Sequence, residues 1–300
     1  MPNTLAHAGV QSVVTRFGYR SADLKLIYLA CIIPDVPWIL QRIAWFVMPG
    51  IDPFTLRAYV IVQASILCCL FLCAAVAVVA RSPWTTFGLL AANSVLHLLL
   101  DALQTKWANG VHLLAPFSWE LINWGLFWPE SMITYVMSGL GLVYIVTYWR
   151  RSTFVQVPLR LSATRLAAAG TFIAAYGLLP LFLLQEPIEA NNHFLRILTA
   201  NSRSGQYVEF DRVRYTQTEE GGALEYWGRE QIAVEGVDID PPASVSVRGV
   251  FTGNQKIRVT DYHVHPDGVR NAASYIGLIL IMTVWVIAWV RDTSSRRSKG

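Results

Sequence analysis

The residues best suited to chemistry are His97 and Asp101, four residues apart in the apolar stretch Val-Leu-His-Leu-Leu-Leu-Asp. On a helix this spacing places an imidazole and a carboxylate on one face, about one turn apart. The stretch is apolar enough for a bilayer, where an ionisable side chain is costly and by default marks a functional site. His112 follows in the next loop. The alternative is that His97 joins a hydrogen-bond network and Asp101 marks the helix end at the membrane surface.

Two further candidates lie nearer the N-terminus. Asp35 is flanked by prolines in the middle of the apolar segment 25–48. Prolines interrupt the backbone ladder, and irregular backbone at membrane depth is tolerated only where protein or a water-filled cavity covers it. We therefore expect Asp35 to face other helices or a polar pocket. His7 lies in the amphipathic segment 4–20, which is too short to span; a lone histidine there is more typical of a membrane interface.

These residue types favour metal-assisted hydrolysis. Two histidine nitrogens with one or two carboxylate oxygens suit zinc or manganese with an open position for water. Such a metal lowers the pKa of bound water and polarises a carbonyl or phosphoryl oxygen. Asp35, if it is not a ligand, could act as the general base. The candidate metal ligands are therefore His7, His97, Asp101 and His112.

The composition predicts a membrane protein with a soluble insert. Of 300 residues, 54% are hydrophobic and only 15% are charged, whereas soluble domains carry about 25% charged residues. The net charge of +4 needs no nucleic acid to explain it, and the opening residues predict no cleavable signal peptide. We expect a polytopic α-helical protein of about six spans, at 25–48, 59–80, 84–104, 132–149, 166–184 and 272–290.

Residues 186–270 differ in character from the rest of the chain. Period-two alternation recurs at 207–213, 245–250 and 256–260, bounded by Gly, Asn and Pro, which is typical of half-buried strands. We expect a small β domain of about five strands, of the OB barrel type. His263 and His265 alternate on the last strand, and a surface pair is a better interpretation than a metal site because no third ligand is near in sequence.

Basic residues predict the topology. Arg150, Arg151, Arg160 and Arg165 lie between the fourth and fifth spans, and a basic tail follows the sixth. By the positive-inside rule these segments and both termini are cytoplasmic. The expected units are the membrane bundle 1–150, a cytoplasmic loop with the fifth span at 151–185, the extracytoplasmic β domain 186–270, and the last span with the basic tail at 271–300.

The order of the candidate residues resembles a known family, the LexA-regulated, inner-membrane-bound metal-dependent hydrolases. The resemblance covers roughly residues 1–150 and does not extend to the β domain. It implies a metal site inside the bundle of a bacterial inner-membrane protein and a hydrolytic reaction. The elements that carry it are His7, Pro34-Asp35, His97 with Asp101, and the loop from Gly110 to Pro116-Phe117.

The second span departs from the family pattern. Family members carry His-Arg-Gly-x-Thr-His-Ser there, whereas this chain reads Leu-Arg-Ala-Tyr-Val-Ile-Val-Gln-Ala-Ser at 56–65. Two expected ligands are thus missing. Either the site uses fewer protein ligands, with His112 compensating, or the chain is a degenerate member.

Three functions remain open on the sequence. The first is a hydrolase acting on a lipid-linked or envelope substrate, with membrane lipid as its surroundings. The second is a non-catalytic membrane protein whose residues 186–270 bind an envelope protein or scaffold an assembly. A transporter is third, because no internal repeat is evident. With a cytoplasmic N-terminus, His7 can join the other ligands only if segment 4–20 re-enters the bundle.

Overall fold

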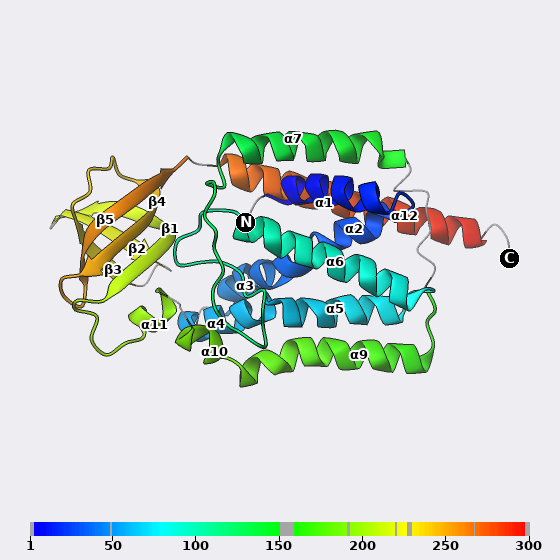
Figure 1. Ribbon diagram of the computed structural model, residues 1–300, viewed down its shortest axis with the longest axis horizontal. Helices are drawn as coiled ribbons and strands as arrows, with labels where there is room; N and C mark the ends of the chain where they lie inside the picture. Colours follow the sequence, from blue (N-terminus) through cyan, green and yellow to red (C-terminus); the bar gives the residue numbers. More distant parts are fainter. Residues whose placement is uncertain are drawn as a thin grey trace.

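The computed structural model describes residues 3–48, 50–150, 159–190, 193–219, 221–226, 230–266 and 268–297. Helices run side by side along the long axis, and a five-stranded sheet lies at one end (Figure 1). The helices are α1 (Thr4–Gly18), α2 (Leu24–Ala30), η1 (Ile33–Asp35), α3 (Val36–Val47), α4 (Pro53–Gln63), α5 (Ile66–Val78), α6 (Pro83–Ala102), α7 (Met132–Thr147), α9 (Ala163–Leu178), η2 (Leu179–Phe182), α10 (Glu186–Glu189), α11 (Leu195–Leu198) and α12 (Val269–Arg297).

Four helical segments in the described residues are long and apolar enough to cross a membrane: Leu24–Val47, Pro83–Ala102, Ala163–Phe182 and Arg270–Arg291. The bent pair α4 and α5, at 61°, would make a fifth. The fourth predicted span, 132–149, corresponds to α7, a shorter apolar helix of 16 residues. The predicted helices are present, but fewer than six of those in the described residues have the length and apolarity of a full span.

The first span is broken where the sequence predicted it. α2 ends at Ala30, η1 forms a short 3-10 turn, and α3 begins at Val36. Proline stands in the first turn of both η1 and α3, where its missing N–H costs no helical hydrogen bond. Asp35 therefore projects from an interruption in the backbone.

Helix α1 lies inside the bundle, packed against α7 and α12 (Figure 1). Three glycines make this close approach possible. A Cβ at Gly9 would overlap the backbone of Gly141, one at Gly141 would overlap the carbonyl oxygen of Leu5, and one at Gly277 would lie 2.8 Å from the amide nitrogen of Leu5. Segment 4–20 thus enters the protein, as the participation of His7 in a site requires.

The directions of the helices correct the expected position of the N-terminus. The N-terminal end lies near the sheet, whereas the C-terminus lies at the opposite end of the bundle (Figure 1). The charge pattern predicted both termini at the same end of the bundle, whereas in the structure they lie at opposite ends. α1 runs away from the sheet, so Arg16 in its last turn lies toward the opposite end of the bundle.

The predicted five strands are present. They are β1 (Tyr207–Thr218), β2 (Gly221–Tyr226), β3 (Glu230–Glu235), β4 (Ala243–Phe251) and β5 (Lys256–His265). Their hydrogen-bonding order is β1-β2-β3-β5-β4, and β4 pairs again with β1, so the sheet closes on itself. All pairs are antiparallel except β3 with β5. Closure leaves few backbone groups at an open edge.

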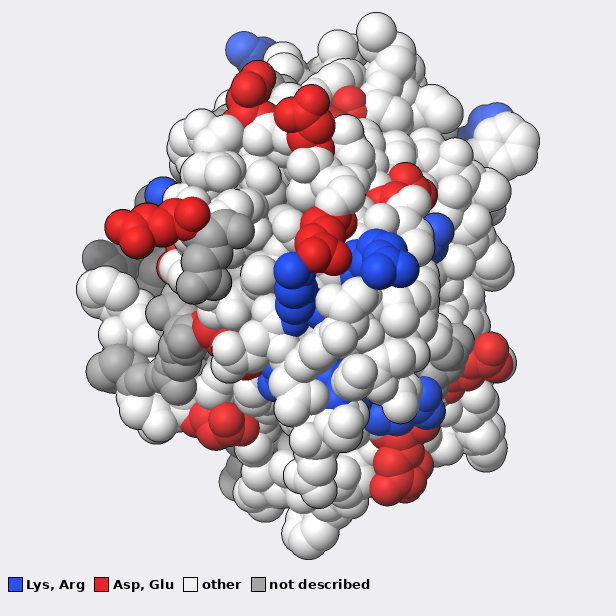
Figure 2. Space-filling view, turned by 90° about the vertical axis from the view of Figure 1, so that its left-hand side faces the viewer, with Lys and Arg blue, Asp and Glu red and all other residues white. Residues whose placement is uncertain are grey.

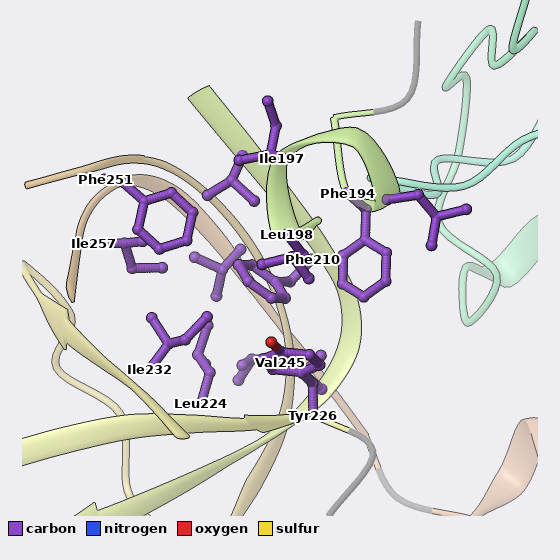
Figure 3. Packing of buried hydrophobic residues seen from close by; sticks show 14 of the residues in the cluster. Phe194, Ile197, Leu198, Phe210, Leu224, Tyr226, Ile232, Val245, Phe251 and Ile257 are labelled. Carbon is purple, nitrogen blue, oxygen red and sulfur yellow. The ribbon is translucent and has the colours of Figure 1, made fainter. Parts of the chain in front are cut away.

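Alternate residues of the strands fill the interior of the sheet. Phe210, Leu224 and Ile232 are fully buried and point toward one another, and α11 supplies further side chains from one end (Figure 3). The same apolar cluster includes Ala58 and Ile61 of α4. The core of the sheet is therefore continuous with the helical bundle.

The carboxylate of Glu130, in the segment before α7, binds three side chains of the sheet. Glu130 contacts the guanidinium of Arg212 at 2.6 Å, Nε2 of His263 at 2.6 Å and Nδ1 of His265 at 2.7 Å. Burial alone would raise the pKa of Glu130, but hydrogen bonds from both histidines and the charge of Arg212 lower it below its usual range. Trp128 stacks on His263 with ring centroids 3.8 Å apart.

We predict that Glu130→Gln destabilises this junction. Hydrogen bonds to charged groups contribute about 1.5–3 kcal/mol, so the free energy of unfolding should fall by about that amount, measured as a lower Tm by tryptophan fluorescence. A depressed carboxyl pKa stabilises the fold above the unfolded-state value of about 4.3 and loses this effect as the pH falls. The wild type should therefore lose more stability than the variant between about pH 6 and pH 3. Glu120→Gln, exposed in the same segment, is the control; equal Tm values for both variants would contradict the prediction.

Candidate metal centre

Three buried side chains converge between α1 and α6. Ligand atoms of His7, His97 and Asp101 all lie within 4.8 Å of one another. His97 and Asp101 share one face of α6, as their spacing predicted. His7 lies on helix α1, which packs against α7 and α12. Asp35 approaches from the break in the first span, with Oδ1 3.4 Å from Nε2 of His97.

The separations are longer than good hydrogen bonds. Nε2 of His7 lies 3.5 Å from Oδ1 of Asp101, and Nε2 of His97 lies 3.9 Å from Oδ2 of the same carboxylate. Good N–H···O bonds measure about 2.7–3.2 Å, whereas two ligand atoms each about 2.05 Å from a tetrahedral zinc lie about 3.3 Å apart. The imidazole rings of His7 and His97 are parallel, with centroids 3.7 Å apart.

Several of these atoms lack hydrogen-bond partners among the described residues. They are Nε2 of His7, both ring nitrogens of His97 and Oδ1 of Asp35, all buried. Buried polar atoms are normally paired because an unmade hydrogen bond costs free energy. Lone pairs that converge without donors are the arrangement that a cation satisfies. These residues therefore fit a divalent metal ion.

One cation of the chain already lies beside the group. Nζ of Lys106 is 3.1 Å from Oδ1 of Asp101, and both side chains are almost fully buried. The guanidinium of Arg270 also interacts electrostatically with Asp35 and Asp101. These cations lower the cost of keeping the carboxylates in a medium of low dielectric constant.

A second layer of contacts orients His7. The side-chain amide of Gln11 lies 3.5 Å from Nδ1 of His7 and contacts Sγ of Cys31 at 3.1 Å. All three side chains are fully buried. The amide nitrogen of Gln11 donates to Nδ1 of His7, while its oxygen accepts from the thiol of Cys31. These contacts hold the imidazole ring in position. Gln11 was not among the residues that sequence reasoning selected, and its four-residue spacing from His7 is the signal that could have identified it.

His112 lies apart from the three-ligand group. Its Nδ1 is 2.8 Å from the carbonyl oxygen of Trp119, and its Nε2 is buried without a partner among the described residues. Burial lowers the pKa of His112 to about 4, so the imidazole is neutral near neutral pH. A cavity of about 20 Å³ is lined by both His112 and Asp101, which is room for one water molecule. The expectation that His112 replaces a missing ligand is not met; it borders the site across this cavity.

The residues that replace the family histidines make other contacts. At 56–65 the guanidinium of Arg57 stacks on Trp38, 4.4 Å from the ring centroid. Gln63 donates a hydrogen bond to the hydroxyl of Tyr59. This part of α4 contributes no ligand to the group, whereas Asp35 and His7 approach His97 and Asp101 from other elements.

A second group could also hold a metal ion: Glu130, His263 and His265. The expectation of a surface histidine pair is wrong for His265, which is 3% exposed. Sequence reasoning missed the third member because Glu130 lies more than a hundred residues away. Its contacts differ from those of the first group, because Glu130 is bonded to Arg212 and Nε2 of His265 lies 2.7 Å from Oγ of Ser246. The polar atoms of this group already have hydrogen-bond or ion-pair partners in the protein, so we regard the group as structural.

Comparisons of the chain with family models, curated proteins and solved structures give no match. The interpretation of the site therefore depends on its own geometry.

We predict that Gly141→Ala disrupts the centre from a distance. Its new Cβ would overlap the carbonyl oxygen of Leu5, so α1 must move and carry His7 with it. Overpacking of this kind costs about 1–3 kcal/mol, and displacement of a ligand should weaken metal affinity by at least about tenfold. Thermal unfolding and metal titration of the purified protein measure the two effects.

Gly139→Ala is the matched control, because no heavy atom lies within 4 Å of its Cβ position. This variant should keep both the wild-type Tm and the wild-type metal affinity. If Gly141→Ala behaved like Gly139→Ala, the close packing of α1 against α7 would not determine the position of His7.

Proposed function

We propose that this chain is a membrane-embedded metal-dependent hydrolase. The observation that carries the proposal is the convergence of His7, His97 and Asp101 with nitrogen lone pairs that no described donor satisfies. Two imidazoles and one carboxylate are a typical ligand set for a catalytic zinc, which keeps an open position for water. Manganese is the second metal that this mixture of nitrogen and oxygen ligands suits.

In this proposal each residue has a distinct task. His7, His97 and Asp101 would hold the ion, which would supply Lewis-acid chemistry for activating water and polarising a carbonyl or phosphoryl oxygen. Asp35, whose Oδ1 lies 3.4 Å from Nε2 of His97, would serve as the general base that accepts a proton. His112 borders a water-sized cavity with Asp101, and its neutral Nε2 can accept a hydrogen bond from a water there. Lys106 balances the charge of Asp101.

The route to Asp35 favours a lipid-linked substrate. A cavity of about 90 Å³ lies between α3 and α12, with Asp35 in its wall. Apolar side chains such as Ile39 and Leu278 line it together with Arg42 and Arg270. A molecule with an acyl or prenyl tail and a polar head matches this mixture, because the tail meets apolar side chains while the head meets the arginines. Guanidinium groups suit an anionic head group.

The finer architecture is part of the same proposal. The closed order of the five strands supports an OB-type barrel. The basic residues support an extracytoplasmic position for residues 186–270 and a cytoplasmic position for the C-terminal tail. The resemblance of residues 1–150 to LexA-regulated, inner-membrane-bound metal-dependent hydrolases supports a location in a bacterial inner membrane.

Two observations favour a non-catalytic alternative. Residues 56–65 lack the two histidines of the family pattern, and Lys106 already pairs with Asp101. In this alternative the cluster is a structural network, and residues 186–270 bind an envelope protein. The two functions differ in one measurable property, the presence of bound metal.

The metal content of detergent-purified protein tests the proposal. Elemental analysis should find about one zinc or manganese ion per chain, as expected for a single catalytic site, and the double variant His97→Ala, Asp101→Ala should lose it. His263→Ala controls for the second group and should keep the ion. Wild-type protein that stays metal-free after reconstitution with excess zinc and manganese would overturn the hydrolase proposal. Loss of the ion in His263→Ala alone would place the metal in the other group.

A further inference from the structure

A larger cavity lies between the segment that joins α6 to α7 and the outer face of strands β1, β4 and β5. Its volume is about 590 Å³, which is typical of sites for small molecules. Its lining contains none of the four residues of the candidate metal centre. The cavity is therefore separate from the candidate metal centre.

Aromatic rings form one part of the wall. Trp107 is buried beneath the guanidinium of Arg248, 4.4 Å from its ring centroid, and Trp128 is covered by His263. Trp124 and Tyr262 also line the cavity but are 50% and 40% exposed. Two aromatic side chains thus leave much of their surface open at the cavity. Aromatic rings combine apolar faces with a polar rim and lose little conformational entropy when they bind.

The polar groups of the wall are held in fixed orientations. Glu209 accepts hydrogen bonds from the backbone N–H of Ala108 at 2.7 Å, the hydroxyl of Tyr207 at 2.8 Å and Nε of Arg248 at 3.0 Å. Asp261 stands opposite Arg248 in the pairing of β4 with β5. Planar groups that the protein has already oriented can bind a ligand without the cost of ordering them.

The side chain of Asn123 adds an unsatisfied acceptor. Its amide nitrogen contacts the backbone oxygens of Lys106 and Asn109, which anchors the side chain in the wall. Its Oδ1 is buried without a partner among the described residues. Gly125, at φ +60°, lies beside it, and a Cβ there would approach this oxygen at 3.7 Å. This positive φ is a conformation that glycine adopts without strain.

The charges of the wall disfavour an anion. Two carboxylates, Glu209 and Asp261, stand against one guanidinium, Arg248. Figure 2, which views the molecule from the sheet end, shows acidic and basic side chains interspersed over that face. A nucleic acid or a phosphate would require an excess of positive charge. A neutral ligand with many hydroxyl groups and apolar C–H faces matches both the carboxylates and the open rings.

We propose that this cavity binds a neutral saccharide. The C–H face of a sugar ring lies on Trp124 or Tyr262, and its hydroxyls donate hydrogen bonds to Asp261 and accept them from Arg248. Glu209 acts as a positioning residue because its oxygens are already occupied by Ala108, Tyr207 and Arg248. Binding requires no covalent step.

Calorimetric titration of the full-length protein tests the proposal. Maltotetraose and tetra-N-acetylchitotetraose are the probes, and the detergent must lack a sugar head group because a maltoside would compete. At least one probe should bind, and Trp124→Ala should weaken that binding by about tenfold, equivalent to about 1.4 kcal/mol. Asp261→Ala should weaken it to a similar extent. Trp84→Ala, which alters a tryptophan that does not line the cavity, should bind like the wild type.

Three results would overturn the proposal. The first is the absence of binding of both probes at millimolar concentration. The second is binding that neither Trp124→Ala nor Asp261→Ala weakens. The third is saturable binding of inorganic phosphate that Arg248→Ala abolishes, which would assign the cavity to anions. Equal Tm values for Trp124→Ala and the wild type verify that a loss of binding is not a loss of folding.

Discussion

The burial of Asp101 inside an apolar bundle is the constraint on which the rest of the structure depends. A carboxylate removed from water loses several kcal/mol of solvation, so the surrounding elements must supply compensating partners. Lys106 comes from the loop after α6, His97 from the same helix face, and His7 from another helix. Each partner restricts where its own element can lie. The path of α1 and of the loop after α6 follows from this requirement.

Small residues on the opposite side of α1 allow this helix to pack closely against its neighbours, which places His7 near Asp101. Helices in a membrane gain little from hydrophobic association, so close backbone contact and hydrogen bonds hold them together. Gly9, Gly141 and Gly277 provide such contact, and the side chain of Asn3 exchanges hydrogen bonds with Ser138 of α7. A polar face toward the candidate metal centre and a small-residue face toward α7 and α12 explain the pattern of the first half of α1, whose buried residues lie between Thr4 and Ser12.

Local relationships in this chain could be predicted from the sequence, and distant ones could not. His97 and Asp101 share a face because four residues make about one helical turn, and Asp35 lies in a break because prolines cause it. The strands followed from period-two alternation. The contact between His7 and Asp101 depends on glycine packing among three helices, and that between Glu130 and His265 joins segments far apart in the chain. His112 was misplaced because loop geometry, unlike helix geometry, does not follow from spacing.

The position of Gly277 determines when the packing of α1 against α12 can form during synthesis. Proteins emerge from the ribosome N-terminus first, and their earlier segments fold before the later ones exist. α1 carries His7 and is made first, yet one wall of its groove is α12, the last helix. The contact between α1 and α12 therefore forms only after α12 has been made. Until then the nascent chain holds α1 without one of the helices that fix its position.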